Sequence, residues 1–101
     1  MPQHKYFLSL RAEEDLIEIW GYSFNKWGEK QADKYIDDIY ERFQWLAKNP
    51  HLGKPRSDIE DGYYSYMQGS HLIFYIINSH GISIIGLPHQ VMDVINYFNP
   101  S

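Results

Sequence analysis

The chain contains no cysteine among its 101 residues, which excludes a disulfide scaffold and a zinc site built on thiolates. It also lacks a long apolar run, because the longest one, Leu72–Ile77, is far too short to cross a bilayer. The first residues, Met1–Lys5, have no apolar core of the kind found in secretory signals. We therefore expect a cytoplasmic protein.

Cations are missing from the second half of the chain. All nine lysines and arginines lie between Lys5 and Arg56, and the net charge is -4. The later residues carry four acids without a basic partner: Asp58, Glu60, Asp61 and Asp93. Nucleic-acid binders usually present a basic face, and phosphoryl transfer needs cations around the developing charge. This distribution counts against a nuclease and against direct sequence-specific binding of nucleic acid.

What is present is enough for one folded domain, which we place at residues 1–101: 44% of the residues are hydrophobic and 17% are aromatic. Alternating or continuous apolar runs predict strands, and apolar residues three and four apart predict helices. The predicted strands are 6–10, 63–68, 71–77 and 82–87. One predicted helix begins at Arg11 and ends at Trp27, and a second spans Ala32–Ala47 and ends at Asn49-Pro50. Val91–Phe98 is a possible short terminal helix.

These elements predict an α+β fold with the order β-α-α-β-β-β. The short connection at Gly28 makes the two helices an antiparallel hairpin, and the turns at Gly69-Ser70 and 78–81 make the last three strands a meander. We expect the helix hairpin to pack on one face of a small antiparallel sheet.

The strand at His71–Ile77 has no polar face. Leu72, Phe74 and Ile76 point to one side of the sheet, and Ile73, Tyr75 and Ile77 point to the other. The helix hairpin covers only one side, so the other needs a second cover. Two alternatives for this second cover stay open, and both can hold at once. The terminal helix folds back over that face, or another chain fills the groove.

Candidate chemistry in this half is limited to a few side chains. His71 opens one strand and His89 follows another, so the two rings can meet at one end of the sheet, with Tyr64 and Tyr66 as further acid–base candidates. A metal site there would also need Asp93. Local hydrogen bonding is the simpler role for both histidines, and we expect no metal and no cofactor.

Several blocks of sequence resemble the RelE/ParE toxin superfamily. They run in order along nearly the whole chain: Leu10-x-Ala12-x-x-Asp15-Leu16-x-x-Ile19, Trp27-Gly28-x-x-Gln31-Ala32-x-x-Tyr35, Phe43-x-x-Leu46-Ala47-x-Asn49-Pro50-x-x-Gly53-x-x-Arg56, Gly69-Ser70-His71-x-Ile73-Phe74-Tyr75 and His89-Gln90-x-Met92-Asp93. The last two blocks are similar to the ParE branch.

The resemblance implies a toxin of a bacterial type II toxin–antitoxin system. ParE-like toxins poison DNA gyrase by binding and are not regarded as enzymes, and a disordered C-terminal segment of the antitoxin folds onto the toxin. We expect the antitoxin to contact apolar residues of the hairpin and of the open sheet face: Leu16, Trp20, Tyr64, Tyr66, Ile73, Tyr75 and Ile77. The gyrase-binding candidates are His89, Gln90, Met92, Asp93 and Phe98.

Two alternatives stay open. The RelE branch contains ribosome-dependent mRNA endonucleases that rely on basic residues, for which His71 and His89 would be the candidates here. A non-toxic homologue that only binds an antitoxin is the other. Where ParE-like sequences often read Arg-x-Leu-His, this chain has Gly86-Leu87-Pro88-His89. Gly86 permits a bulge and Pro88 alters the strand exit, so the departure bears on whether the toxin is active.

Overall fold

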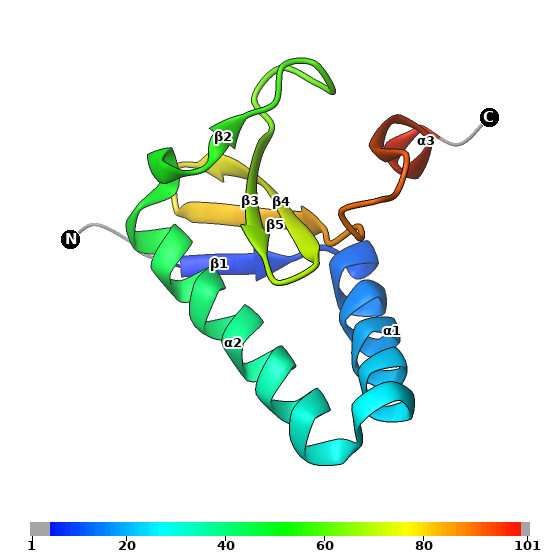
Figure 1. Ribbon diagram of the computed structural model, residues 1–101. Coiled ribbons are helices and arrows are strands. Elements are labelled where there is room, and N and C mark those ends of the chain that lie inside the picture. Colours follow the sequence, from blue (N-terminus) through cyan, green and yellow to red (C-terminus); the bar gives the residue numbers. More distant parts are fainter. Residues whose placement is uncertain (1–4, 100–101) are drawn as a thin grey trace.

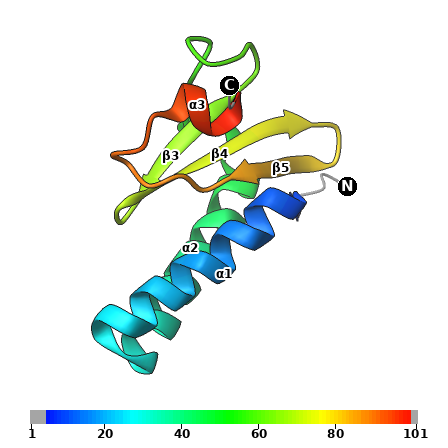
Figure 2. The same ribbon diagram turned by 90° about the vertical axis from the view of Figure 1, so that its right-hand side faces the viewer.

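The chain folds into three layers, as the computed structural model shows for residues 5–99 (Figure 1). Helices α1 (Leu10–Trp27) and α2 (Glu29–Lys48) cover one face of a five-stranded sheet, and α3 (Val94–Phe98) lies on the other face (Figure 2). The predicted α+β class and element order are confirmed. The prediction about a secretory signal rests mainly on residues 1–4, which lie outside the described residues.

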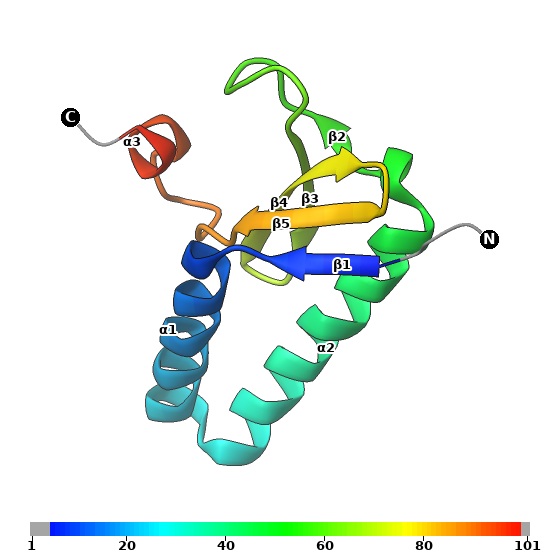
Figure 3. The same ribbon diagram turned by 180° about the vertical axis from the view of Figure 1, so that it is seen from behind.

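The sheet is mixed, with the strand order β1-β5-β4-β3-β2. Its strands are β1 (Lys5–Leu8), β2 (Lys54–Pro55), β3 (Tyr64–Gln68), β4 (His71–Asn78) and β5 (Gly81–Gly86). The last three form the predicted antiparallel meander, and β2 extends it as a short antiparallel edge. Figure 3 shows β1 running beside β5 in the same direction, so the sheet is not wholly antiparallel.

The helix hairpin begins and ends where local chemistry dictates. The Ser9 side chain accepts a hydrogen bond from the Ala12 amide (3.1 Å) and so caps α1. Gly28 follows α1 with a φ of 92°, a conformation that side chains disfavour, and α2 starts directly after it. Helix α2 stops before Pro50, which opens a short 3-10 turn (Pro50–Leu52). No helix within residues 5–99 is both long and apolar enough to span a membrane.

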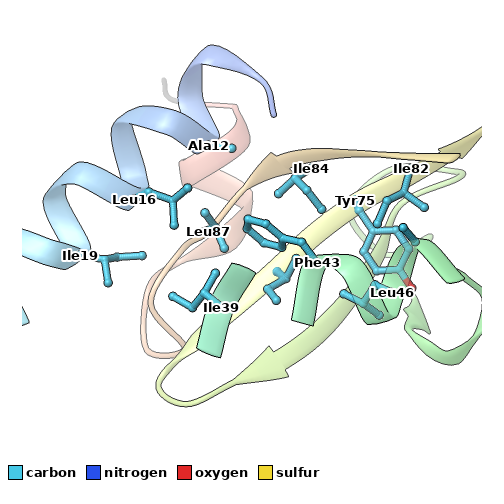
Figure 4. Packing of buried hydrophobic residues seen from close by; sticks show 12 residues of the cluster. Ala12, Leu16, Ile19, Ile39, Phe43, Leu46, Tyr75, Ile82, Ile84 and Leu87 are labelled. Carbon is cyan, nitrogen blue, oxygen red and sulfur yellow. The ribbon is translucent and has the colours of Figure 1, made fainter. Parts of the chain in front are cut away.

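The core lies between the helix hairpin and one face of the sheet (Figure 4). Phe43 of α2 and Leu16 of α1 meet Ile84 of β5 and Tyr75 of β4 there, and Tyr75 and Phe43 are fully buried. Ile73 is also fully buried against the helices, and Ile77, Tyr64 and Tyr66 are half-buried beside them. We predicted that the open face of the sheet would carry Tyr64, Tyr66, Ile73, Tyr75 and Ile77, and that assignment is wrong.

The outer face of the sheet therefore carries the other set, Leu72, Phe74 and Ile76, and its cover is partial. Helix α3 folds back over it: the Phe98 ring packs on Phe74 (5.0 Å between centroids) and on Tyr63 (5.4 Å). Leu72 and Ile76 remain half-buried. The terminal helix therefore covers Phe74, as the first alternative predicted, while Leu72 and Ile76 stay partly accessible.

Candidate functional site

An exposed apolar surface lies along the outer side of α1. Ile17 is 72% exposed and Trp20 is 36% exposed, and both line a shallow groove of about 390 Å³. We call this the α1 groove: Leu8, Leu16, Ile17, Trp20, Ile36 and Tyr40, with Glu13 at its rim. The Trp20 ring stacks on Phe24 (5.1 Å), and its indole N–H donates to Asp33 (2.9 Å). A rigid aromatic side chain in an accessible groove is a typical anchor for a partner.

Trp20 is the one residue of the predicted antitoxin set that is exposed. Leu16 lines the groove but is 6% exposed, and Ile73 and Tyr75 have no exposed surface. These buried residues stabilise the domain, because removing them from water drives the helices onto the sheet. The sequence analysis missed Ile17 and Tyr40, although their spacing on the hairpin, one turn from buried positions, was a usable signal.

The predicted gyrase-binding residues belong to a C-terminal arm, which we define as Leu87–Asn99. Its outward side is apolar: Val91 is 81% exposed, and Met92 and Ile95 are at least half exposed. Gln90 and Asp93 are also exposed, but Asp93 accepts a hydrogen bond from the Asn96 amide (3.3 Å) and so caps α3. Phe98 faces the sheet, where it holds α3 in place.

A polar contact fastens the arm to α1. The Tyr97 hydroxyl donates to the Asp15 carboxylate, which also accepts the Leu87 amide (2.9 Å). The Arg11 guanidinium lies 4.2 Å above the Tyr97 ring. Burial, together with the Asp15 carboxylate, raises the pKa of the Tyr97 phenol well above its usual range. Neither Arg11 nor Tyr97 was a predicted site residue, since only the fold brings them together.

Gly86 and Pro88 take defined places in this region. Phe74 pairs with Gly86 and Tyr75 with Ile84, so Ile85 is the extra residue of a bulge at the end of β5. A side chain at position 86 would collide with the Tyr97 ring, so this glycine makes room for α3. Pro88 follows the end of β5, yet its carbonyl still accepts the Leu72 amide (2.9 Å).

The two histidines meet as predicted. His71 and His89 form an isolated bridge between the chain segments, and their ring centroids lie 5.1 Å apart. The Tyr35 hydroxyl lies 2.8 Å from Nδ1 of His71, and the Val91 amide donates to Nδ1 of His89 (3.2 Å). Burial, and then the neighbouring His89, lowers the pKa of His71 to about 4. Local hydrogen bonding therefore accounts for Nδ1 of both rings.

The structure offers few groups for catalysis or metal binding. Among residues 5–99, no cluster of three or more histidines, aspartates and glutamates is arranged to hold a metal ion. Arg56 does reach the outer sheet face, where its guanidinium lies 5.1 Å from the Phe74 ring, so that face is not free of cations as the sequence suggested. Its charge is matched by Asp58, with N–O distances of 3.0 and 3.1 Å. Asp58 has a lowered pKa because it accepts these hydrogen bonds.

The fold of this chain, a helix hairpin on a five-stranded sheet followed by a short arm, has a match among solved structures. A chain from the structure titled "Chromosomal ParDE TA system from P. aeruginosa" superposes with a TM-score of 0.74. The match covers 86% of this chain and 98% of that one, and the sequences are 19% identical. This likeness confirms the fold.

Sequence similarity then gives the family. Residues 6–94 match the family described as "ParE toxin of type II toxin-antitoxin system, parDE", and the chain belongs to it. It is 35% identical to Toxin ParE1 of Mycobacterium tuberculosis over 91 residues, which cover 89% of this chain and 93% of that protein. It is 36% identical to Toxin ParE1 of Caulobacter vibrioides over 88 residues, which cover 87% and 91%. The predicted ParE branch is confirmed.

Proposed function

We propose that this ParE toxin acts by binding DNA gyrase and not by catalysis. The observation that carries the proposal is the C-terminal arm, whose apolar side chains Val91, Met92 and Ile95 face solvent while Tyr97 and Phe98 fix the arm to the domain. An apolar surface held on a rigid scaffold favours protein binding. Because gyrase acts on bacterial DNA, we place this activity in the cytoplasm.

Purified protein tested on gyrase decides this proposal. We expect the chain to inhibit supercoiling of a relaxed plasmid and Met92→Asp to weaken the inhibition at least about tenfold, because a charge would be buried at the interface. Leu52→Asp is the matched control, since Leu52 is similarly exposed (58%) but lies outside the arm. No inhibition by wild-type protein, or equal effects of both substitutions, would contradict the proposal.

The second part of the proposal concerns the antitoxin. The α1 groove is accessible, apolar and continuous with the β1 edge of the sheet through Leu8. A flexible segment with spaced apolar residues fits such a groove, because it folds as it binds and covers a large surface. We propose that the C-terminal segment of the cognate antitoxin binds there, with Trp20 as an anchor.

This docking site is tested with the protein encoded beside the toxin gene. We expect Ile17→Asp to weaken binding of that protein by at least about tenfold, since an interface cannot bury a lone carboxylate cheaply. Ile17 is mostly exposed in the free toxin, so the substitution should leave the fold intact. Unchanged affinity of Ile17→Asp, with Leu52→Asp as the control, would place the antitoxin elsewhere.

The nuclease alternative has one observation in its favour, the meeting of His71 and His89. Against it, Arg56 is paired with Asp58, and Arg11 lies over aromatic rings of the arm, so neither is free to stabilise a phosphorane. Lys26, which lines the same cavity as the two histidines, would have to do so alone. Ribosome-dependent cleavage of mRNA that is lost in His71→Ala would support the nuclease. If the protein neither cleaves mRNA nor inhibits gyrase, the non-toxic antitoxin binder is the alternative that remains.

A further inference from the structure

A second cavity lies between the two helices at the end of the sheet and is separate from the α1 groove. We call it the hairpin cavity; its walls include Lys26, Trp27, Lys34, Tyr35, His71 and His89, and its volume is about 380 Å³. This volume lies within the range of small-molecule sites. The helices supply one side of it, and the turn between β3 and β4 and the exit of β5 supply the other.

Hydrogen bonds fix the two imidazoles of this cavity in one tautomer. Nδ1 of His89 accepts the Val91 amide, so the ring proton of His89 is on Nε2. The Tyr35 hydroxyl accepts the Ser70 amide (2.9 Å) and lies 2.8 Å from Nδ1 of His71, closer than its other acceptor, the Gln68 carbonyl (3.3 Å). We infer that it donates to the nearer acceptor, Nδ1, which places the proton of the neutral His71 ring on Nε2 as well.

His71 and His89 both line the cavity, and neither Nε2 atom has a hydrogen-bond partner among residues 5–99. A protonated ring nitrogen has no lone pair for a metal ion, so this arrangement favours a negatively charged or strongly polar acceptor. The neighbouring charges agree: the Lys34 ammonium is matched by Asp38 at 3.0 Å, whereas Lys26 has no ion pair within the described residues. Asp15, which also lies near His71, is engaged by Leu87 and Tyr97.

The opposite wall of the cavity is aromatic. Trp27 is 55% exposed and meets Tyr22 edge-on, with ring centroids 6.4 Å apart, and the Lys26 ammonium lies 4.9 Å from the Trp27 ring. Both rings lie outside the core cluster between helices and sheet and are more than half exposed. The Lys26 ammonium also lies 5.6 Å from the Tyr22 ring, so a ligand that stacks on these rings would lie beside this charge. A flat ring stacks well against such a wall, in the way aromatic pairs do in protein interiors.

We propose that the hairpin cavity binds a small aromatic anion. Its ring would lie against Trp27 and Tyr22, and its carboxylate or phosphate would accept hydrogen bonds from His71 and His89 beside the Lys26 charge. The inference depends neither on gyrase binding nor on the antitoxin, and it gives these histidines a role other than catalysis. Since His89 opens the accessible part of the C-terminal arm, an occupied cavity lies next to the proposed effector surface.

Three probes of increasing likeness to the proposed ligand test the site: inorganic phosphate, phenol and phenyl phosphate. Each is titrated into the full chain while the amide and indole N–H signals are followed by NMR. We expect saturable shifts of Trp27, Ser70 and His89 with phenyl phosphate, at a dissociation constant of roughly 1 mM or below. Each half of the ligand alone should bind at least about tenfold more weakly, because it makes only part of the contacts.

Two substitutions of His89 distinguish hydrogen-bond donation to the ligand from a purely structural role of the ring. Asparagine at position 89 retains an acceptor near the place of Nδ1 but lacks a donor at Nε2, whereas glutamine places an amide N–H near Nε2. His89→Asn should therefore weaken phenyl phosphate binding at least about fivefold, and His89→Gln should keep most of it. Lys26→Gln should weaken binding to a similar degree, while Lys30→Gln, on the same hairpin but outside the cavity, should not change it.

Three results would overturn the proposal. The first is the absence of saturable shifts with phenyl phosphate up to about 10 mM. The second is binding that inorganic phosphate reproduces, which would mean that the aromatic wall contributes nothing. The third is equal affinity of Lys26→Gln and Lys30→Gln, and this pair decides the question even if a histidine variant fails to fold.

Discussion

At the scale of single residues, Tyr75 joins the core to the segment that follows α2. Its ring is fully buried, its hydroxyl donates to the Pro50 carbonyl (2.7 Å) and accepts the Gly53 amide (3.0 Å). Burial raises the pKa of Tyr75 to about 12, so the phenol stays protonated as this donor role requires. Tyr75 thus acts as a structural residue and not as the exposed partner contact that we predicted from its side of the strand.

Tyr75→Phe should destabilise the domain by about 1–3 kcal/mol, because it leaves the buried Gly53 amide and the Pro50 carbonyl without a partner. Urea unfolding followed by circular dichroism measures the change. Tyr22→Phe is the control, since that hydroxyl is exposed and its substitution should stay within about 0.5 kcal/mol. Equal stability of Tyr75→Phe and wild-type protein would contradict the assigned role.

His71 should make folding stability dependent on pH. Its folded-state pKa is about 4, below the ordinary value of 6.5, so the unfolded chain binds more protons between these values. Stability from this group is therefore complete above pH 6.5 and is lost as pH falls toward 4. The loss should be about 1–2 kcal/mol, less than the full shift implies because solvent screens a half-buried ring.

Unfolding titrations of wild-type protein and His71→Asn at a series of pH values measure this term. Asparagine retains an acceptor for the Tyr35 hydroxyl but does not titrate. The stability difference between the two proteins should shrink as pH falls from 6.5 to 4. A difference that is independent of pH across this window would show that His71 does not titrate with a lowered pKa.

At the scale of elements, the helices were the most predictable part of the chain. Their ends depend on local chemistry, such as Gly28 between them and Pro50 after the second. The pairing of β1 with β5 was not predictable, because the partners are distant in sequence and no turn specifies the register. The short strand β2 was not predicted, because its two residues, Lys54 and Pro55, are too few to form an alternating apolar pattern.

The prediction of which side of β4 faces the helices was wrong, and the strand pairing shows why. The strand β4 has two apolar sides, so its own pattern cannot tell which one faces the helices. Its neighbours carry the missing signal: Ser65 pairs with Phe74, and Ser83 pairs with Ile76. Cross-strand partners share a face, so these serines mark the outer side once the register is known. Because that signal was overlooked, residues that are buried in the core were predicted to contact the antitoxin.

The docking of α3 can be tested through the hydroxyl of Tyr97. Tyr97→Phe removes the donor to Asp15 but keeps the ring against Gly86 and under Arg11. We expect amide exchange in α3 to quicken at least about fivefold, while the helix hairpin keeps its protection, since a lost hydrogen bond contributes about 1 kcal/mol. Unchanged exchange in α3 would mean that Phe98 alone holds the arm.

At the scale of the whole molecule, one small domain carries three candidate surfaces. The α1 groove and the hairpin cavity both draw on α1 and α2 but share no lining residue, whereas the C-terminal arm adjoins the hairpin cavity at His89 and shares no element with the α1 groove. An antitoxin in the α1 groove therefore need not cover Met92 and Val91 directly. Competition between antitoxin and gyrase for the toxin would show whether the rest of the antitoxin's bulk, or a second contact, blocks the arm.

The central claim is that the toxin traps gyrase through the outward side of its arm. The most direct measurement is the amount of linear plasmid recovered after gyrase, ATP and toxin are incubated and then treated with detergent and protease. The account predicts that linear DNA accumulates with wild-type toxin and with Leu52→Asp, and falls at least about tenfold with Met92→Asp. Linear DNA that appears without gyrase, or none with active gyrase and wild-type toxin, would contradict it.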